Sequence, residues 1–450
     1  MSRLSLLLIT VLALGVTHML CAEPPNEQPT KKPEAAEAPS KPAEKKDAEK
    51  ESEKEAEKKE PVHAIVGGTI LSVALPPIHR GVLLFQGSKI LAMGSEIPIP
   101  EGAIVHSAEG QYVSPGLIAI QASIRNAQHS FGNFADNLDP YHRDLHIALA
   151  AGITTLHVKS GFVFHFGGRV FTSGGGQTAV IKATYRDLDG MLVKEPASLS
   201  ITVQRRMSSI FDLRDKFERA AKYLRELAEA TKAKKKPPKM PRGLSKYVDV
   251  LRNELPTICT VYDLESIRTL LELRKDYPFQ LVLSGTNDGW KIARQLAGLN
   301  VPVIVKTRGP DFFFDMDAPV LGDENMIPIK RPATYAASGV RVALLPYRGN
   351  VSLAGLAGRD LTSLAFEAAF AIRGGLDEEL ALQAITLEPA RMLKIDDRVG
   401  SLEVGKDADI LIWSGHPLHY RSFVKTVWIN GKVYYEKDKS PLFKHVPLPQ

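Results

Sequence analysis

The spacing of apolar residues changes twice along this chain of 450 residues, and each region predicts a different kind of structure. Between residues 62 and 111 the apolar positions follow no helical period, which predicts strands alone. We expect these strands at 63–73, 81–86 and 89–93. Gly87-Ser88, between the last two, suits a type II′ hairpin turn, which places Gly first.

From Leu117 onward, short apolar runs alternate with amphipathic segments. This alternation indicates a parallel sheet covered by helices, and the number of units fits a (β/α)8 barrel of the TIM type. The predicted strands lie at 117–120, 154–158, 179–182, 257–261, 280–283, 301–305 and 340–345. The predicted helices lie at 139–151, 211–230, 264–275, 289–299, 332–338 and 361–373.

After Leu393 the pattern returns to strands, and Asn430-Gly431 is a strong signal for a hairpin between two of them. Strands at both ends predict an α/β fold in which a small composite β-sandwich domain lies beside the barrel. The predicted strands lie at 408–413, 424–429 and 432–435. The predicted domains are 62–112 plus 396–438 for the composite β domain, 113–395 for the barrel and 439–450 for a tail.

The first 61 residues differ in composition from the rest. Arg3, an apolar run at 4–16 and a small residue at Ala22 predict a signal peptide of residues 1–22. The mature chain is then expected to be exported, either periplasmic or secreted, with no transmembrane span after cleavage. Lipoprotein processing at Cys21 is the alternative. Residues 23–61, rich in Pro, Glu, Lys and Ala, lack the apolar side chains needed for a core and predict a disordered tether.

The formal net charge of +6 raises the question of nucleic-acid binding. Six of the basic residues fall in one segment, 232–242, without the interleaved aromatic residues of a nucleic-acid motif, so we predict no nucleic-acid partner. Cleavage after Ala22 leaves Cys259 as the single cysteine, with no partner for an intrachain disulfide. Cys259 lies in an apolar strand, and we interpret it as a small core residue.

The candidate chemistry begins where the strand after Val113-Ser-Pro-Gly ends. Gln121 and Ser123 follow this strand with one residue between them. Residues two apart on a strand point the same way, so we expect both side chains to face the same space. A metalloenzyme would place two His ligands there. Amide and hydroxyl groups are poor ligands for Zn²⁺.

Several segments together resemble the amidohydrolase superfamily, and in particular its exported imidazolonepropionase-like branch. The resemblance covers residues 62–436, effectively the whole folded part. The segments that carry it are Val113-Ser-Pro-Gly-Leu-Ile, Ala151-Gly-Ile-Thr-Thr-Leu, Gly175-Gly-Gln-Thr-Ala-Val-Ile-Lys, Ala384-Ile-Thr-Leu-Glu-Pro-Ala-Arg-Met-Leu, Val399-Gly-Ser-Leu-Glu-Val-Gly-Lys-Asp-Ala-Asp and Val427-Trp-Ile-Asn-Gly-Lys-Val.

This resemblance implies hydrolysis of non-peptide C–N bonds by one or two divalent metals, usually zinc, at the C-terminal mouth of the barrel. The family's ligands are a His-x-His pair on strand one, His residues on strands five and six, sometimes a modified Lys, and an Asp on strand eight. The matching positions here hold Gln121, Ser123, Thr260, Tyr262, Ser284 and Tyr347. We therefore predict no metal and no other cofactor.

Other residues are candidates for a ligand site or a rebuilt metal site. Lys182 is interpreted in three ways: as the modified lysine, as a ligand contact, or as a partner of a carboxylate. His142 and His146, four apart on a predicted helix, have a spacing that can bind metal but lie in an outer helix. The candidate ligand-binding residues are Gln177, Lys182, His129 and His165.

Two functional hypotheses follow. In the first, the chain is a degenerate, metal-free member of the superfamily that binds a small-molecule ligand or acts as a partner subunit of a metal-competent relative. In the second, it is an active exported C–N hydrolase with a rebuilt or metal-independent site. The catalytic residues stay unknown under both hypotheses, and fold-level analogy alone does not supply an activity.

Overall fold

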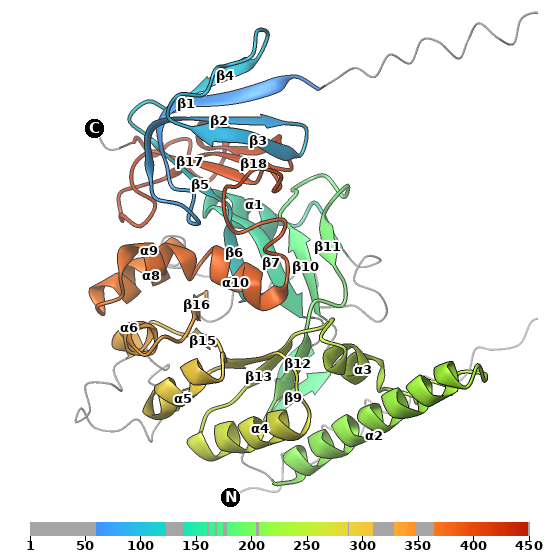
Figure 1. Cartoon of the computed structure of the whole chain (residues 1–450). Coiled ribbons are helices and arrows are strands. Elements are labelled where there is room, and N and C mark those ends of the chain that lie inside the picture. Colours follow the sequence, from blue (N-terminus) through green and yellow to red (C-terminus); the bar gives the residue numbers. More distant parts are fainter. Residues whose placement is uncertain are drawn as a thin grey trace, which may run out of the picture. The chain divides into compact units, whose positions relative to one another are not determined.

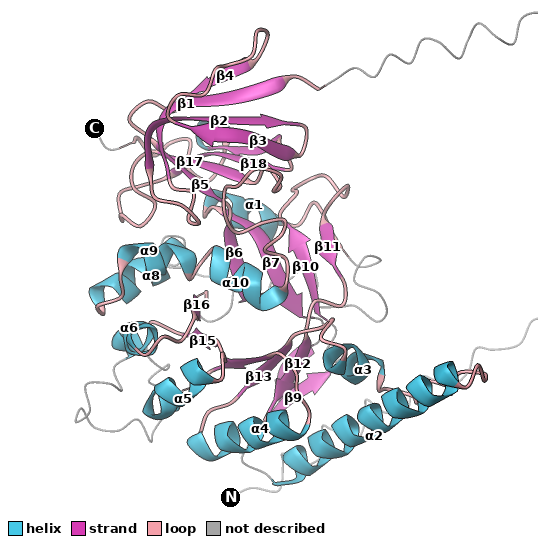
Figure 2. Cartoon of the chain, in the orientation of Figure 1, coloured by secondary structure: helices cyan, strands magenta, loops and turns pink. Residues whose placement is uncertain are grey.

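A computed structural model of the chain describes residues 60–122, 138–159, 162–166, 169–173, 178–203, 207–286, 288–308, 328–346 and 364–448. The predicted signal peptide and nearly all of the predicted tether therefore lie outside the described residues. The described part forms an eight-stranded, a five-stranded and a four-stranded sheet and one two-stranded hairpin, with helices alongside (Figure 1 and Figure 2). Within these ranges, no helix combines the length and apolar character that a membrane span requires.

The eight-stranded sheet unites strands from both ends of the described chain. Its order is β19-β18-β17-β5-β1-β2-β3, with β4 paired to β1. The two ends of the chain meet where β17 pairs with β5 in antiparallel register. The strands are β1 (Val62–Ile70), β2 (Ile78–Gln86), β3 (Lys89–Gly94), β4 (Ile104–Ser107), β5 (Tyr112–Pro115), β17 (Ile410–Trp413), β18 (Val424–Ile429) and β19 (Lys432–Glu436).

Both predicted hairpin turns are present in this sheet. Gly87, between β2 and β3, has φ +52°, and Asn430 and Gly431, between β18 and β19, have φ +50° and +73°. These are the left-handed conformations that two-residue hairpin turns require. All eight strands pair within one sheet, so the sandwich arrangement of this domain stays a prediction.

The middle of the chain forms the other two large sheets. The four-stranded sheet has the order β11-β10-β7-β6, and the five-stranded sheet runs β12-β13-β14-β15-β16 with every neighbouring pair parallel. The first sheet contains β6 (Leu117–Ala122), β7 (Ile153–Lys159), β10 (Thr178–Lys182) and β11 (Leu192–Lys194). The second contains β12 (Leu199–Thr202), β13 (Thr257–Thr260), β14 (Leu281–Ser284), β15 (Val303–Val305) and β16 (Val342–Leu344).

The direction of β10 corrects the prediction of a wholly parallel sheet. β10 runs antiparallel to β7, with Thr178 opposite Lys159 and Lys182 opposite Thr155. A parallel pair needs a crossover connection, usually a helix. Here the chain between the two strands forms the hairpin of β8 (Phe162–Phe166) and β9 (Arg169–Ser173), so β10 returns in the opposite direction. His165, one of the candidate ligand-binding residues, lies on β8.

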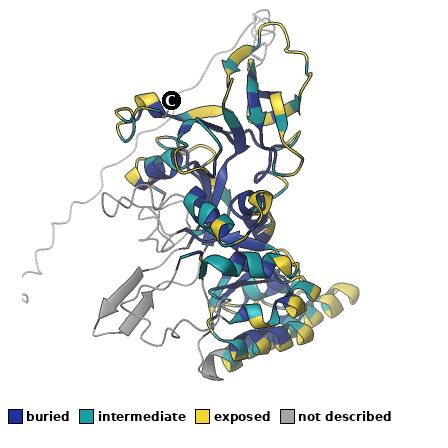
Figure 3. Cartoon of the chain, turned by 90° about the vertical axis from the view of Figure 1, so that its left-hand side faces the viewer, coloured by how far each residue is buried: buried dark blue, intermediate teal, exposed yellow. Residues whose placement is uncertain are grey.

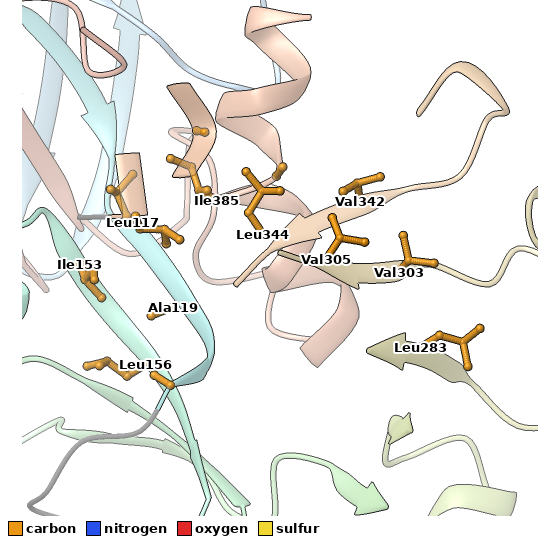
Figure 4. Packing of buried hydrophobic residues seen from close by; sticks show 14 of the residues in the cluster. Leu117, Ala119, Ile153, Leu156, Leu283, Val303, Val305, Val342, Leu344 and Ile385 are labelled. Carbon is orange, nitrogen blue, oxygen red and sulfur yellow. The ribbon is translucent and has the colours of Figure 1, made fainter. Parts of the chain in front are cut away.

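Backbone hydrogen bonds connect the two central sheets. The N–H of Ile118 donates to the carbonyl of Ile385 (2.8 Å), and the N–H of Leu344 donates to the carbonyl of Ala384 (3.0 Å). Residues 384–385 thus lie between β6 and β16, and Figure 4 shows Ile385 between Leu117 and Leu344. Among the described residues the strand pairs themselves do not join into one closed ring, so the closed (β/α)8 barrel stays a prediction.

Alternate residues of the central strands enter two different cores, as the two-residue period of a strand requires. One set includes Leu117 and Val303 and belongs to the large core that also takes in helix residues (Figure 4). The other set, which includes Ile118, Val282 and Ile304, forms a separate cluster with residues of helix α10 (Leu387–Leu393). Figure 3 shows that the central strands and the helix faces packed on them are buried, whereas the outer helix faces are exposed.

The helices agree with most of the predicted segments but differ at their ends. The segment predicted at 139–151 becomes helical only at Arg143, because His142 is the N-cap and its Nδ1 accepts a hydrogen bond from the N–H of Asp144. The segment at 289–299 is a 3₁₀ turn followed by α5. The helices are α1 (Arg143–Ala150), α2 (Met207–Lys232), α3 (Ser245–Leu251), α4 (Leu264–Asp276), α5 (Ala293–Gly298), α6 (Arg331–Ala337), α8 (Leu364–Arg373), α9 (Glu378–Gln383) and α10 (Leu387–Leu393).

Gly116 permits the close approach of β6, β7 and the composite sheet. A Cβ atom at this position would lie 1.9 Å from Oγ1 of Thr154, which is buried at the start of β7. The N–H of Gly116 donates to the carbonyl of Asp409 (3.0 Å), just before β17. The glycine of the Pro-Gly turn is therefore required by packing, because a side chain there would clash with Thr154.

We expect Gly116→Ala to lower the free energy of unfolding by about 1–3 kcal/mol, because the added methyl group overpacks a buried site. Urea denaturation of the purified protein measures this change. Gly298→Ala is the matched control, since a Cβ there meets no atom within 4 Å, and we expect it to be neutral or stabilising. Equal stability of both variants would show that the approach of Thr154 to Gly116 does not constrain the fold.

Candidate functional site

The polar residues at the ends of the central strands form a connected set, which we call the mouth network: Gln121, His157, Thr178, Ser198 and Ser284. Gln121 and His157 lie near the ends of β6 and β7, Thr178 begins β10, and Ser284 ends β14. Thr178 lies beside the end of β7 because β10 is antiparallel to it. Gln121 and Ser284, which match metal-ligand positions in the family resemblance, are brought together in this network.

Gln121 bonds to two other strands. Its φ of +52° is left-handed, which is uncommon for a residue other than Gly, Asn or Asp. The side-chain Oε1 accepts a hydrogen bond from the hydroxyl of Ser284 (2.6 Å), and the backbone N–H donates to Nδ1 of His157 (3.2 Å). Since Gln121 is not extended, the two-residue period that predicted a shared direction for Gln121 and Ser123 does not apply there. Ser123 lies outside the described residues.

The hydrogen bonds of His157 fix its tautomer. A backbone N–H can only donate, so Nδ1 of His157 is unprotonated and accepts from Gln121. The proton is then on Nε2, which lies 3.0 Å from Oγ of Ser198. The Ser198 hydroxyl donates to Oγ1 of Thr178 (3.2 Å), and Thr178 in turn donates to the carbonyl of Ser198 (2.7 Å). Both ring nitrogens of His157 are occupied within the protein.

Burial keeps this imidazole neutral. His157 is 2% exposed, and its burial lowers the pKa to about 3, with further lowering from the positive charges of Lys159 and Lys194. A neutral ring with both nitrogens hydrogen-bonded neither ligates a metal nor accepts a proton without breaking the mouth network. His157 lies within the predicted strand 154–158, and its place among the apolar residues of the run Thr154-Thr-Leu-His-Val was the available signal.

The residues at the family's ligand positions do not fit a catalytic zinc ion. Oε1 of Gln121 already accepts a hydrogen bond from Ser284. Thr260 offers only a neutral hydroxyl at the end of β13. Tyr262 lies beyond that strand and is 54% exposed. Zinc favours imidazole, thiolate and carboxylate ligands. Within the described ranges, no group of three or more His, Cys, Asp or Glu side chains is arranged to hold a metal. Tyr347, His129 and Gln177 lie outside the described residues, and only the backbone of His165 is described.

One buried carboxylate near the end of β15 was missed in the sequence. Glu367 on α8 is 1% exposed and accepts hydrogen bonds from the hydroxyl of Thr307 and from Nε of Arg308 (2.9 Å) and its Nη2. These donors neutralise and orient the carboxylate, so it is engaged as a structural ion pair. A single acidic residue inside the apolar run Leu364-Ala-Phe-Glu-Ala-Ala-Phe was the signal that pointed to it.

Lys182 lies at the opposite end of β10 from the mouth network. Its side chain is fully buried, and the ammonium donates to carboxylate oxygens of Asp407 (2.7 Å) and Asp409 (3.0 Å) and to Oδ1 of Asn430. Burial alone would raise the pKa of Asp407, but the charge and hydrogen bonds of Lys182, together with a bond from Lys89, outweigh it and lower that pKa. Of the three interpretations of Lys182, these contacts agree with the partner of a carboxylate.

The remaining candidates have structural surroundings. His142 precedes α1 as its N-cap, so the prediction that both His142 and His146 lie within a helix is wrong. Nε2 of His146 lies 3.1 Å from Oγ of Ser440, and its ring lies near Tyr185 and Tyr435. Cys259 is fully buried on β13, and burial raises the pKa of its thiol to about 12, which leaves no reactive thiolate.

Comparison with known proteins places this fold in a class. Residues 337–434 match the family model described as the amidohydrolase family. This part of the chain is thus similar to the amidohydrolase family, and the whole fold has structural neighbours among amidohydrolases.

Particular relatives follow from the same comparison. An amidohydrolase from Thermotoga maritima MSB8 has a TM-score of 0.67 and 25% identity, covering 83% of this chain and 99% of that one. The A. niger ochratoxinase has a TM-score of 0.55 at 14% identity, covering 87% and 99%, and shares the fold alone. A 70-residue segment is 36% identical to the amidohydrolase tasK of Hapsidospora irregularis; it covers 16% of this chain and only 7% of that protein's length.

We expect His157 to make stability depend on pH. Its folded pKa of about 3 lies below the ordinary 6.5, so the unfolded chain binds more protons between these values. The stabilising contribution is complete above pH 6.5 and decreases as pH falls toward 3, by about 2 kcal/mol at pH 5. His157→Gln, whose amide can make both hydrogen bonds, should lose less stability between pH 7.5 and pH 5 in urea denaturation. The exposed His79→Gln is the control, and an unchanged pH dependence in His157→Gln would contradict this assignment.

We expect Lys182→Met to lower the free energy of unfolding by about 3–5 kcal/mol, because buried Asp409 loses its cationic partner and Asp407 loses the buried one of its three. Chemical denaturation measures the loss. Lys89→Met is the matched control: Lys89 also pairs with Asp407 (2.8 Å), but its side chain is 48% exposed, and we expect a loss of about 1 kcal/mol or less. Similar losses of unfolding free energy in the two variants would mean that the burial of Lys182 does not increase its contribution to stability.

Proposed function

We propose that this protein is a degenerate, metal-free member of the amidohydrolase superfamily that binds a ligand at the mouth network instead of hydrolysing it. The observation that carries this proposal is the 2.6 Å hydrogen bond between Ser284 and Gln121. In the family resemblance both positions belong to metal ligands. Here their side chains satisfy each other, and neither is a strong ligand for zinc.

The chemistry of the mouth network supports recognition of a polar small molecule. Thr260, opposite Ser284 in the pairing of β13 with β14, adds a further hydroxyl to the amide and hydroxyl groups of Gln121 and Ser284. Lys159, at the end of β7, contributes a positive charge close enough to lower the pKa of His157. Neutral donors and acceptors of this kind orient a ligand through hydrogen bonds without activating water.

We also propose that the mature chain is exported and that a metal-competent amidohydrolase relative is its candidate partner. The export proposal rests on the signal-peptide pattern of residues 1–22. The partner proposal rests on the missing metal ligands, since a chain that keeps the fold of hydrolases without their ligands retains surfaces on which a competent subunit can pair.

Metal analysis tests the proposal directly. We expect the purified mature chain, dialysed without chelator, to contain no stoichiometric zinc, iron or manganese by elemental mass spectrometry. Gln121→His combined with Ser123→His restores the family's His-x-His pair, and we expect this variant to remain free of zinc because the positions of Thr260, Tyr262 and Tyr347 still lack ligands.

The controls separate loss of metal from loss of fold. Both proteins must show the same cooperative unfolding, and an amidohydrolase with a complete ligand set must retain its metal through the same dialysis. Near-stoichiometric metal in the wild-type chain would overturn the proposal in favour of an active hydrolase with a rebuilt site. Tight zinc binding by the double variant alone would show that ligands remain on the other strands.

A further inference from the structure

A groove of about 850 Å³ lies where strands β14, β15 and β16 begin, at the edge opposite to the one where β14 ends in Ser284. Gln280, Pro302 and Arg341 come directly before or within two residues of these strands. Part of its lining is apolar, with the buried side chains of Leu271 and Phe279. The groove therefore belongs to a different part of the molecule from the mouth network.

The charge of this groove is unbalanced. Four of its lining residues are cations, and the lining contains no acidic residue. The cations are Arg274, Lys275, Arg341 and Lys394. Four like charges around one open space create a positive potential that attracts anions.

Neutral oxygens hold two of these four cations in place. Arg274 donates to the backbone carbonyls of Phe279 (3.0 Å) and Leu299 (2.7 Å). Lys394 donates to the backbone carbonyl and to Oδ1 of Asn253. These partners orient the charged groups without cancelling their charge. Burial without a compensating anion lowers the pKa of both Arg274 and Lys394.

The other two cations have acidic neighbours outside the groove. Arg341 donates to Oδ1 of Asn300 (3.2 Å) and lies 3.7 Å from Glu388, which has a closer partner in Arg391 at 2.7 Å. Lys275 pairs with Glu272 on the same helix (2.7 Å), in an exposed arrangement of little strength. Arg274 and Lys394 also lie at helix C-termini, where cations are favourable, but Arg341 precedes a strand and has no such reason to be there.

We propose that this groove binds a small molecule with two or more oxyanion groups, phosphate or carboxylate. The oriented guanidinium of Arg341 and the ammonium groups of Lys275 and Lys394 take the anionic groups, because charge-assisted hydrogen bonds to phosphate and carboxylate are the strongest that these side chains make. Pro278 and Leu299, two lining residues that are not buried, contact the apolar part of the ligand. This site is independent of the function proposed for the mouth network.

Titration calorimetry of the full mature chain at low salt tests the proposal, with pyrophosphate and citrate as separate probes. We expect saturable binding of at least one, and the probe that binds identifies the class of anion. Arg341→Gln combined with Lys394→Gln should raise the Kd at least about tenfold, because two charge-assisted contacts are lost. Lys235→Gln combined with Lys236→Gln removes the same charge from the exposed segment 232–242 and should leave the Kd unchanged.

A further variant guards against misfolding. Lys275→Gln changes a side chain that is 62% exposed, so it should fold normally and still weaken binding. Binding of neither probe by the wild-type chain would overturn the proposal. Equal weakening by the groove variant and by the control variant would also overturn it, since binding would then follow net charge and not the groove.

Discussion

The buried ion cluster of Lys182 is the interaction on which the arrangement of this protein depends. Its ammonium group reaches Asp407, Asp409 and Asn430, so one side chain of the four-stranded sheet holds the segment before β17 and the turn after β18. Asp407 is also bound by Lys89 of β3 and by Arg398. A buried charge is tolerated only when an opposite charge compensates it, so Lys182 and its two carboxylates depend on one another. They fix how the composite sheet docks on the centre of the chain.

At the other end of β10 the mouth network follows the opposite rule, because it is built from neutral groups. A single backbone N–H, that of Gln121, determines which nitrogen of His157 carries the proton, and each later hydrogen bond follows from that choice. The family resemblance implies a charged metal site that activates water, whereas these residues offer fixed dipoles. This contrast between a charged structural centre and a neutral mouth supports the proposal of a binding protein over that of a hydrolase.

The sequence predicts element types well where the signal is local. Hydrogen bonding and periodicity over a few residues are enough to predict the turn at Asn430-Gly431 and the helix beginning at Leu264. The same holds for the strands of the five-stranded sheet, which alternate with helices along the chain. The direction of β10 was not predictable in this way, because it depends on the connection β8–β9 and not on the strand itself. For the site, the sequence predicted only that the family's metal ligands are replaced by other residues. The partners of Gln121 and Lys182 lie 163 and 225 residues away, and no local pattern gives such distances.

The composite sheet imposes an order on folding. β5 and β17 pair directly, and Trp413 of β17 donates to the hydroxyl of Ser114 on β5, 299 positions earlier (2.9 Å). Contacts of such high sequence separation form slowly, because the intervening chain must first be brought together. During synthesis β5 has no partner at this junction until β17 leaves the ribosome. The nascent chain therefore carries an incomplete sheet edge for most of its translation, and chaperones that bind exposed strands have their longest opportunity there.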